Sequence, residues 1–421
     1  MCFQNLKPVL PAVRSIAAVL CLTVASVNPG FAHKGDKGKD AKITVMTQNQ
    51  YLGADLEPLV TASDPIAFNE ALVFVLQTIG ASNYPERVQE LARTIKKNKP
   101  DLVGLQEMWS FECTPTSATF DDPCSLFGPA FNDHLTETLE ALQDIDAGYY
   151  EAATVQNIAF EDTLPGSPFP GIPIHLDGDG VPEIFLTFRD RDVILARDDV
   201  EAVPVTYDCV RPSLDGCNFE TVAETTLGGL PFNIERGFVA VDAIVKGRNY
   251  RFVNTHLEVR FPDPSFPLSR FIQSAQASEL MGLLTTQPAP LDSRLLLVGD
   301  INSAPDDVFP AETSGPFLTP YQQFVTGLSL AGAVISAPYL DAWTEQKKGK
   351  PKPGLTCCEA ADLRNEESQH DRRIDVIFSL DEPKNVKAKV LNVRKKDKTD
   401  SGLWPSDHAT VVAKFKFRDR D

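Results

Sequence analysis

Polar residues that can bind a cation or transfer a proton recur where apolar runs of this sequence end. They follow the runs ITVMTQ, DLVGLQ, FVNT and RLLLVG or lie within RRIDVIF and WPSDH, and they are Asn49, Glu107, His256, Asp300, Asn302, Asp375, Asp407 and His408. Apolar runs form buried strands, and strand ends place side chains on a rigid rim. We therefore expect these side chains to meet at one rim of the fold.

Each of these residues has an ordinary structural explanation when it is taken alone. A glutamate after a strand is commonly a solvated turn residue, an asparagine such as Asn302 can cap a turn, and a histidine such as His256 can be a hydrogen-bonded core residue. Their recurrence in one order along the chain is what favours a shared functional site.

The carboxylates and the amide are suited to holding a hard divalent cation. Glu107 is the first candidate ligand, with Asn49 and Asp407 expected near it. A cation bound by oxygen ligands screens an anionic phosphate ester and stabilises the negative charge that develops during attack. Mg²⁺ fits because it needs few protein ligands and keeps several waters, and Mn²⁺ or Ca²⁺ could replace it.

The histidines are suited to proton transfer, because imidazole titrates near neutral pH. We predict that His408 is the general base and that Asp375 orients its ring and stabilises its charged form. His256 would contact the phosphate or protonate the leaving group.

Three further residues complete the predicted site. Asp300 would orient the nucleophile or assist a metal, and Asn302 would donate a hydrogen bond to a phosphoryl oxygen. Arg236 lies in ERGFVAV, before the NTH segment, and is either a charged phosphate contact or a surface cation.

Taken in order, the segments TQN, LQE, NTHLE, GDINS, RIDVIF and SDH resemble the endonuclease/exonuclease/phosphatase superfamily. This superfamily includes deoxyribonuclease-like nucleases, apurinic endonucleases, neutral sphingomyelinases and inositol-polyphosphate phosphatases. The segments span residues 43–417, and the resemblance implies a four-layered α/β sandwich in which two packed mixed β-sheets are flanked by helices. Members differ over whether the equivalent of Asp300 or of His408 activates water, so these two roles can exchange.

Two positions depart from the superfamily pattern. Ile301 stands in GDIN where an aromatic residue is common, at a position expected to serve packing. Gln48 stands where tryptophan is frequent, which leaves open what lies behind Asn49.

Apolar spacing and turn signals predict the elements that must position these residues. We expect helices over 64–79, 86–98, 131–142 and 269–284, with Asp64 capping the first. The expected strands cover 43–46, 101–106, 184–196, 236–257 as two runs joined by a hairpin turn at 246–249, 294–298, 374–379 and 409–417.

Residues 1–32 have the pattern of a cleavable secretory signal. Lys7 and Arg14 give positive charge, residues 15–27 are apolar but too short to span a bilayer, and cleavage is expected after Ala32. We predict a flexible lead-in over 33–42 and one catalytic domain over 43–421, with insertions at about 108–188 and 303–355. The protein would then be secreted or periplasmic.

The cysteine count fits an exported protein with disulfides. Of eight cysteines two lie in the signal, and the remaining six are Cys113, Cys124, Cys209, Cys217, Cys357 and Cys358. The first four would close two short loops as consecutive pairs. The last two could bridge each other or pair elsewhere.

Composition limits the substrate classes. The chain has 421 residues, 40 Lys+Arg and 58 Asp+Glu, and a formal net charge of −18, so it lacks the broad positive field of non-specific nucleic-acid binders. A metal-dependent nuclease stays open, because a cation supplies local positive charge. The basic stretch 394–398 is either a solvated loop or a polyphosphate contact, and 177–180 (DGDG) is either a glycine-rich turn or part of a calcium loop.

The resulting prediction is an exported metal-dependent phosphoesterase that hydrolyses a phosphodiester in nucleic acid or a phospholipid head group. The alternatives are a phosphomonoesterase of the inositol-phosphate type and a non-catalytic binding protein on the same fold. We expect a monomer with no transmembrane segment and no stable protein partner.

Overall fold

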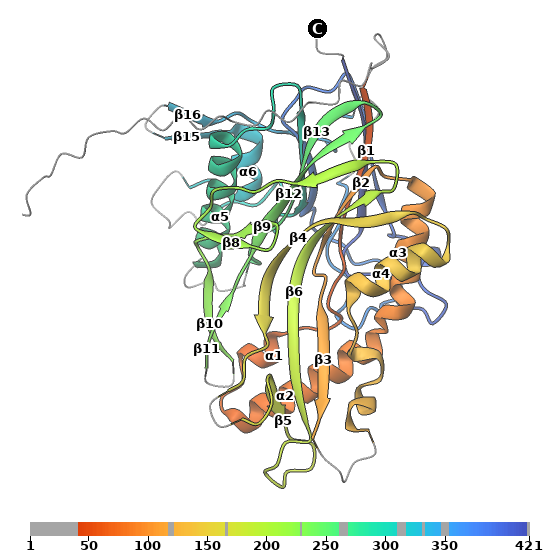
Figure 1. Ribbon diagram of the computed structural model, residues 1–421, viewed down its shortest axis with the longest axis vertical. Helices are drawn as coiled ribbons and strands as arrows, with labels where there is room; N and C mark the ends of the chain where they lie inside the picture. The colour runs from red at the N-terminus through yellow and green to blue at the C-terminus, as the bar shows by residue number, and fades with distance from the viewer. Residues whose placement is uncertain are drawn as a thin grey trace, which may run out of the picture. The chain divides into compact units, whose positions relative to one another are not determined.

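The computed structural model describes residues 41–116, 122–164, 167–227, 230–260, 268–309, 317–330, 333–346 and 353–418. The predicted signal, and all but the last two residues of the predicted lead-in, lie outside these ranges. Figure 1 shows two large sheets with helices against them.

The first sheet has eight strands in the order β19-β20-β1-β2-β6-β3, with β4 and β5 also paired to β6. Its strands are β1 Ala41–Asn49, β2 Leu102–Gln106, β3 Ser110–Pro115, β4 Tyr149–Phe160, β5 Ile172–Ile174, β6 Ile184–Arg197, β19 Asn385–Leu391 and β20 Thr410–Phe417. Strands β1 and β2 are parallel, and the other pairings of this sheet are antiparallel.

The second sheet also has eight strands, in the order β17-β18-β14-β13-β12-β9-β8 with β7 paired to β12. They are β7 Glu201–Pro204, β8 Arg211–Ser213, β9 Gly216–Asn218, β12 Gly237–Val245, β13 Arg248–His256, β14 Arg294–Asp300, β17 Leu340–Asp341 and β18 Asp375–Ser379. Two separate hairpins are formed by β10 Ala223–Leu227 with β11 Leu230–Ile234 and by β15 Leu328–Leu330 with β16 Ala333–Ser336.

The helices cover the outer faces of both sheets. They are α1 Glu57–Val60, α2 Pro65–Ser82, α3 Tyr84–Asn98, α4 His134–Asp144, α5 Leu268–Thr286 and α6 Pro320–Thr326, with short 3₁₀ turns η1 Pro123–Ala130 and η2 Lys395–Asp397. Helices α3 and α4 pack on the first sheet, and α5 and α6 pack on the second. The four-layered α/β sandwich expected from the sequence is confirmed.

The core between the sheets explains why the central strands are apolar on both faces. Val45 and Ile194 of the first sheet pack in one cluster with Val241, Phe252 and Leu296 of the second, and all five are fully buried. Alternate residues of the same strands pack under helices, so neither face of β1 or β14 meets water. Such strands hold their ends rigidly.

Local signals account for the helices that the sequence predicts. Asp64 accepts hydrogen bonds from the backbone N–H groups of Ile66 and Ala67, and Pro65 stands at the first position of α2, as expected. Helix α4 begins at His134 rather than at 131, because Asp133 caps it. Within the predicted insertion 108–188, β3, β4, β5 and the start of β6 belong to the first sheet.

Among the described residues, α2 alone is long and apolar enough to span a bilayer by length and composition. Its Leu72, Val75, Leu76 and Ile79 are buried within this fold. Disulfides join Cys113 to Cys124, Cys209 to Cys217 and Cys357 to Cys358, and they are consistent with an extracellular protein.

Candidate active site

The strand register brings the predicted residues to one rim. In the first sheet Asn49 pairs with Gln106, so Glu107 follows at the same edge. In the second sheet His256, Asp300 and Asp375 form one row, because β13 pairs with β14 in parallel and β14 with β18 in antiparallel register. The loop before β20 delivers Asp407 and His408 to the same edge.

Asn49 connects the two sheets. Its Nδ2 donates to Glu107 Oε1 at 2.9 Å and to Asp300 Oδ2 at 3.2 Å, and its Oδ1 accepts from the Tyr51 N–H at 2.9 Å. The side chain is fully buried. The amide therefore fixes the first-sheet and second-sheet carboxylates relative to each other.

Glu107 is the half-exposed member of this group. It has a left-handed backbone with φ of 57°, and its Oε2 accepts from the Leu52 N–H at 3.1 Å. Tyr51 and Asn302 are also left-handed, with φ of 56° and 50°. Non-glycine residues in this conformation are uncommon and cluster at functional sites, where surrounding contacts hold them.

His408 and Asp375 form a close pair. His408 Nδ1 donates to Asp375 Oδ2 at 2.8 Å, while Nε2 lies 3.7 Å from Asp300 Oδ2. Burial alone would lower the pKa of His408, but the carboxylates of Asp375, Asp407 and Asp300 outweigh it and raise that pKa well above its usual value. Asp375 lies where it would stabilise imidazolium, and the general-base role of His408 stays a prediction.

His256 is held in the opposite charge state. Its Nδ1 lies 3.1 Å from Arg236 Nη1 and its Nε2 lies 3.6 Å from Asp300 Oδ2. Burial, and then the charges of Arg236 and His408, hold the pKa of His256 well below its usual value. Asn302 lies beside it, with Nδ2 at 3.3 Å from His256 Nε2. The two histidines thus face one aspartate, one cationic and one neutral.

Arg236 is not a surface cation. Its side chain is 12% exposed, and its guanidinium lies 3.8 Å from Asp190 Oδ2 and 3.9 Å from Glu258 Oε1. The structure places it behind His256, between that ring and a set of buried acids.

Those buried acids are functional candidates that the sequence analysis missed. Asp190 and Asp192 lie on β6, and Asp192 Oδ1 is 4.0 Å from His256 Nδ1. Asn157 donates to Asp192 Oδ2 at 2.9 Å. Burial raises the pKa of Asp190 to about 7 and that of Asp192 well above its usual value. The signal was the alternation in RDRDV, which puts two acids on one face of an apolar strand.

The loops that carry the rim residues share one buried cation. Arg87 on α3 is fully buried and donates to the backbone carbonyls of Gln50, Tyr51, Ser82 and Pro405. It therefore ties the segment after Asn49 to the segment before Asp407.

The two departures from the superfamily pattern have structural roles. Gln48 is buried and its Nε2 donates to the His408 carbonyl at 3.0 Å, so an amide rather than an aromatic ring supports the loop that carries His408. Ile301 is fully buried in the core under α5, which agrees with a packing position.

The rim residues fit a hard divalent cation. Burial raises the pKa of both Asp300 and Asp407 to about 7, and Asp375 Oδ1 is a buried oxygen without a hydrogen-bond partner. Crowded carboxylates of this kind are costly unless a cation compensates them. Among the described residues, Asp300, Asp375 and His408 bring ligand atoms within 4.8 Å of one another.

Two other groups meet the same distance criterion. Asp177 and Asp179 of the DGDG turn are joined by Glu183, a third acid that the sequence analysis did not assign to this turn. Cys357 and Cys358 lie beside His408, on a loop whose Glu359 N–H donates to the Asp407 carbonyl.

No family model matches the chain, and no curated protein matches it. An endonuclease/exonuclease/phosphatase family protein of Bacteroides thetaiotaomicron is similar in structure, with a TM-score of 0.47 and 15% identity over 90% of this chain and 99% of that one. One from Leptotrichia buccalis gives 0.46 and 16% over 89% and 100%. The mannosyl-6-phosphatase Bt3783 of Bacteroides thetaiotaomicron gives 0.44 and 16% over 89% and 100%.

Proposed function

We propose that the protein is an exported, divalent-metal-dependent phosphoesterase that hydrolyses a phosphodiester. One observation carries the proposal: Asn49 joins Glu107 of one sheet to Asp300 of the other, and His408 with its Asp375 partner faces the same Asp300. Acids, an amide and a paired histidine at one rim supply the groups that phosphoester hydrolysis needs.

Glu107, Asn49 and Asp407 would hold the cation, with Asp300 able to assist. A bound Mg²⁺ would neutralise phosphate charge and stabilise the developing oxyanion, and Mn²⁺ or Ca²⁺ could replace it. Glu107 is half-buried rather than fully buried, and Asn49 holds it in place through Nδ2.

His408 and Asp300 divide the work of activating water. Asp375 fixes the His408 ring by accepting from Nδ1, which leaves Nε2 facing Asp300. The buried carboxylates keep His408 protonated, so the Asp300 carboxylate would accept the proton from water, and His408 Nε2 would accept it only once a bound cation has neutralised those carboxylates and lowered the pKa of His408. Asn302 would donate to a phosphoryl oxygen.

His256 and Arg236 would serve the other side of the phosphate. Arg236 donates toward His256 Nδ1, so the Nε2–H of the neutral ring points to Asp300 and the rim. That N–H would contact a phosphoryl oxygen or pass a proton to the leaving group. A second histidine for the leaving group favours diesters over monoesters.

Export is proposed from two features. The predicted signal would direct the chain out of the cytoplasm with cleavage after Ala32, and the three disulfides suit an oxidising compartment.

The test is hydrolysis of bis-p-nitrophenyl phosphate with Mg²⁺. We expect turnover that EDTA abolishes and that His408→Ala lowers by on the order of a hundredfold or more. Glu112→Gln, which changes a 66% exposed side chain of β3, is the control and should keep full activity. Absence of metal-dependent turnover on this ester, plasmid DNA, RNA, sphingomyelin and inositol phosphates would leave the binding-protein alternative.

A further inference from the structure

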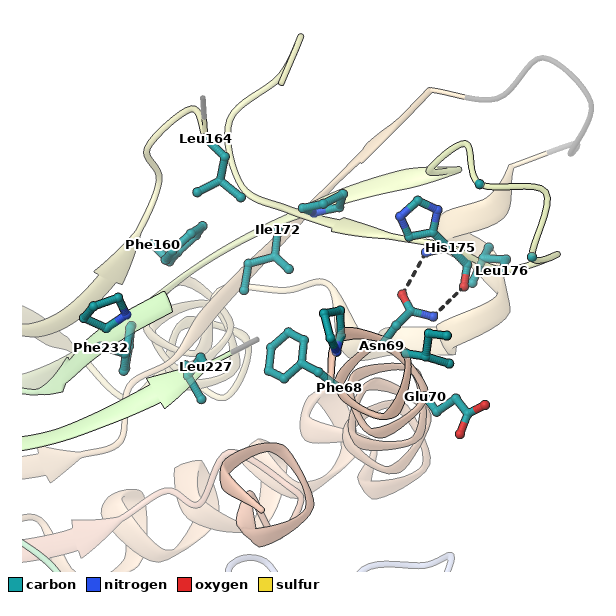
Figure 2. Close-up of a pocket in the computed structure, with 16 residues that line it drawn as sticks. Phe68, Asn69, Glu70, Phe160, Leu164, Ile172, His175, Leu176, Leu227 and Phe232 are labelled. Atoms are coloured by element: carbon teal, nitrogen blue, oxygen red, sulfur yellow. Dashed lines mark hydrogen bonds between the residues drawn. The ribbon is translucent and has the colours of Figure 1, made fainter. Parts of the chain in front are cut away.

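A pocket lies outside the polar rim. It has a volume of about 640 Å³ and is lined mainly by apolar side chains from the start of α2, the end of β4, β5 and the β10–β11 hairpin. Figure 2 shows Phe68, Phe160, Ile172, Leu227 and Phe232 around it. Its size is that of pockets that take small organic ligands.

One wall of this pocket is fixed by paired hydrogen bonds. Asn69 of α2 donates from Nδ2 to the His175 carbonyl at 2.8 Å and accepts at Oδ1 from the His175 N–H at 2.9 Å, as the dashed lines in Figure 2 show. The segment after β5 is thereby held against α2, so the pocket is preformed.

The strand register places the pocket just beyond the rim. On the second sheet Gly237 pairs with His256, and the β10–β11 hairpin precedes Gly237, so it projects past the His256 edge. On the first sheet Ile158 pairs with Asp190, and Phe160 lies two residues further along β4. At about 3.3 Å per residue, Phe160 is roughly 7 Å past the level of Asp190.

Apolar contacts run continuously from the pocket to the rim. Phe188 contacts Phe232 of the hairpin with ring centroids 6.4 Å apart. Both belong to the same apolar cluster as Leu52, whose backbone N–H donates to Glu107 Oε2. Leu52 itself is buried, whereas Phe188 and Phe232 are half-buried, so these two rings offer apolar surface on the side toward the pocket.

The charge around the pocket disfavours a polyanion. The sixteen residues that line it include no lysine or arginine, and they include Glu70. Asp177 and Asp179 are exposed on the turn whose glycines line the pocket. Ile66, which also lines it, is 73% exposed and offers an apolar edge to an entering chain.

We infer that this pocket binds the aliphatic chain of an amphiphilic phosphodiester whose phosphate occupies the rim. The inference rests on the proposed function and narrows it to diesters with an alkyl or acyl arm. Nucleic acid is the other diester class. A protein that binds it places cationic side chains along the phosphate backbone, and the described residues that line this pocket include none.

The test compares ethyl and hexyl p-nitrophenyl phosphate in the presence of Mg²⁺, since both stay monomeric and release p-nitrophenolate. Each methylene that leaves water favours binding roughly fourfold at full burial, so we expect kcat/KM to rise on the order of tenfold or more from ethyl to hexyl. Ile172→Asp, which places a charge in the pocket, and Ile172→Trp, which fills it, should both remove the gain and keep the ethyl rate. Phe74→Asp, at a 59% exposed position of α2 outside the lining, is the matched control and should keep the gain.

Equal rates for the two esters in the unaltered protein would overturn the inference, and so would a hexyl gain that survives both Ile172 variants. Plasmid DNA cleavage that falls with Ile172→Asp as steeply as hexyl turnover would assign the pocket to nucleic acid instead. If neither ester is turned over, the proposed function fails. Calorimetry then tests the pocket by itself: tighter binding of the hexyl diester than of the ethyl diester would support it, and equal affinity would contradict it.

Discussion

At the scale of single residues, Glu107 is the first proposed cation ligand, and glutamine at this position removes its charge while keeping nearly its shape. Glu107→Gln retains the carbonyl oxygen for Asn49 and removes the charge that would bind a cation. We expect turnover of bis-p-nitrophenyl phosphate to fall by on the order of a hundredfold or more, because charge stabilisation by the metal is lost. The measurement is kcat/KM at saturating Mg²⁺.

Glu112→Gln is the matched control for this change. Glu112 lies on β3 of the same sheet with a side chain that is 66% exposed, and it makes a long ion pair to Arg189. The kcat/KM of the Glu112→Gln variant on bis-p-nitrophenyl phosphate should stay within twofold of that of the unaltered protein. A Glu107→Gln enzyme with near-normal turnover would contradict the ligand assignment.

His134 is a buried histidine that gives stability a pH dependence of known sign. Burial, and then the charge of Arg87, hold its pKa well below the usual value, and its ring stacks on Tyr84 with centroids 3.4 Å apart. Below about pH 6.5 His134 therefore binds a proton in the unfolded chain but not in the folded chain. Stability from this site is present above about pH 6.5 and is lost as pH falls toward the depressed pKa, by up to about 1.4 kcal/mol per pH unit.

His134→Phe keeps the stacked ring and removes the titration. Urea unfolding between pH 7 and pH 5 should show the variant losing less stability than the unaltered protein over that window. Parallel curves for the two proteins would show that His134 does not carry the proton linkage.

Residues were predictable from the sequence where a motif put a polar group after a strand. Asn49, Glu107 and Asp300 meet at the rim for that reason, and His408 reaches it from the loop just before β20. Asp190 was not predicted as a site residue, because the charged residues of RDRDV look like those of an ordinary strand with one face in solvent. Only the packing of Arg236 and His256 against β6 shows that this face is buried.

At the scale of elements, the Arg87 guanidinium holds two loops that no strand pairing joins. Arg87→Met keeps much of the apolar stem but removes the hydrogen-bond donor to the backbone carbonyls of Gln50, Tyr51 and Pro405. We expect unfolding by urea to require about 3 kcal/mol less free energy, since hydrogen bonds from a charged group contribute about 1.5–3 kcal/mol each and do not add fully. Activity should fall too, because Asn49 and Asp407 lose their common support.

Arg93→Met on the same helix serves as the comparison. The Arg93 side chain is 60% exposed and, within the described part of the chain, forms an ion pair only with Glu90 one turn away, so its loss should change stability by less than about 0.5 kcal/mol. If the two variants unfold alike, Arg87 is not the tie between the loops.

Helices and strands were predictable from the sequence where a local signal marks where they begin or end, as Asp64 does for the start of α2. Strand β19 was not predicted, although NVKAKVL alternates: Val386 and Ala388 are buried while Lys387 and Lys389 are exposed. This is an edge strand, and its state depends on pairing with β20 rather than on its own residues. The β10–β11 hairpin was likewise not predicted from the sequence, because its apolar side chains Leu227 and Phe232 face a pocket that exists only in the folded chain.

At the scale of the whole molecule, the acids at the rim would link the proposed metal binding to folding stability and to pH. Burial raises the pKa of Asp300 and Asp407 to about 7, so without a cation the folded state holds protons that the unfolded chain has released. Stability from these sites is therefore present at low pH and is lost as pH rises from about 4 to about 7. A divalent cation replaces those protons, so its stabilising effect should grow over the same interval.

Thermal unfolding with 10 mM Mg²⁺ against EDTA measures this without any substrate. We expect the shift in midpoint to be small at pH 5 and larger, by several degrees, at pH 8. Glu107→Gln should reduce the shift at pH 8, whereas Glu112→Gln should leave it unchanged. A shift of equal size at both pH values, or one that survives Glu107→Gln, would place the cation elsewhere, because only ligands that exchange protons for metal at the rim couple the two in this direction.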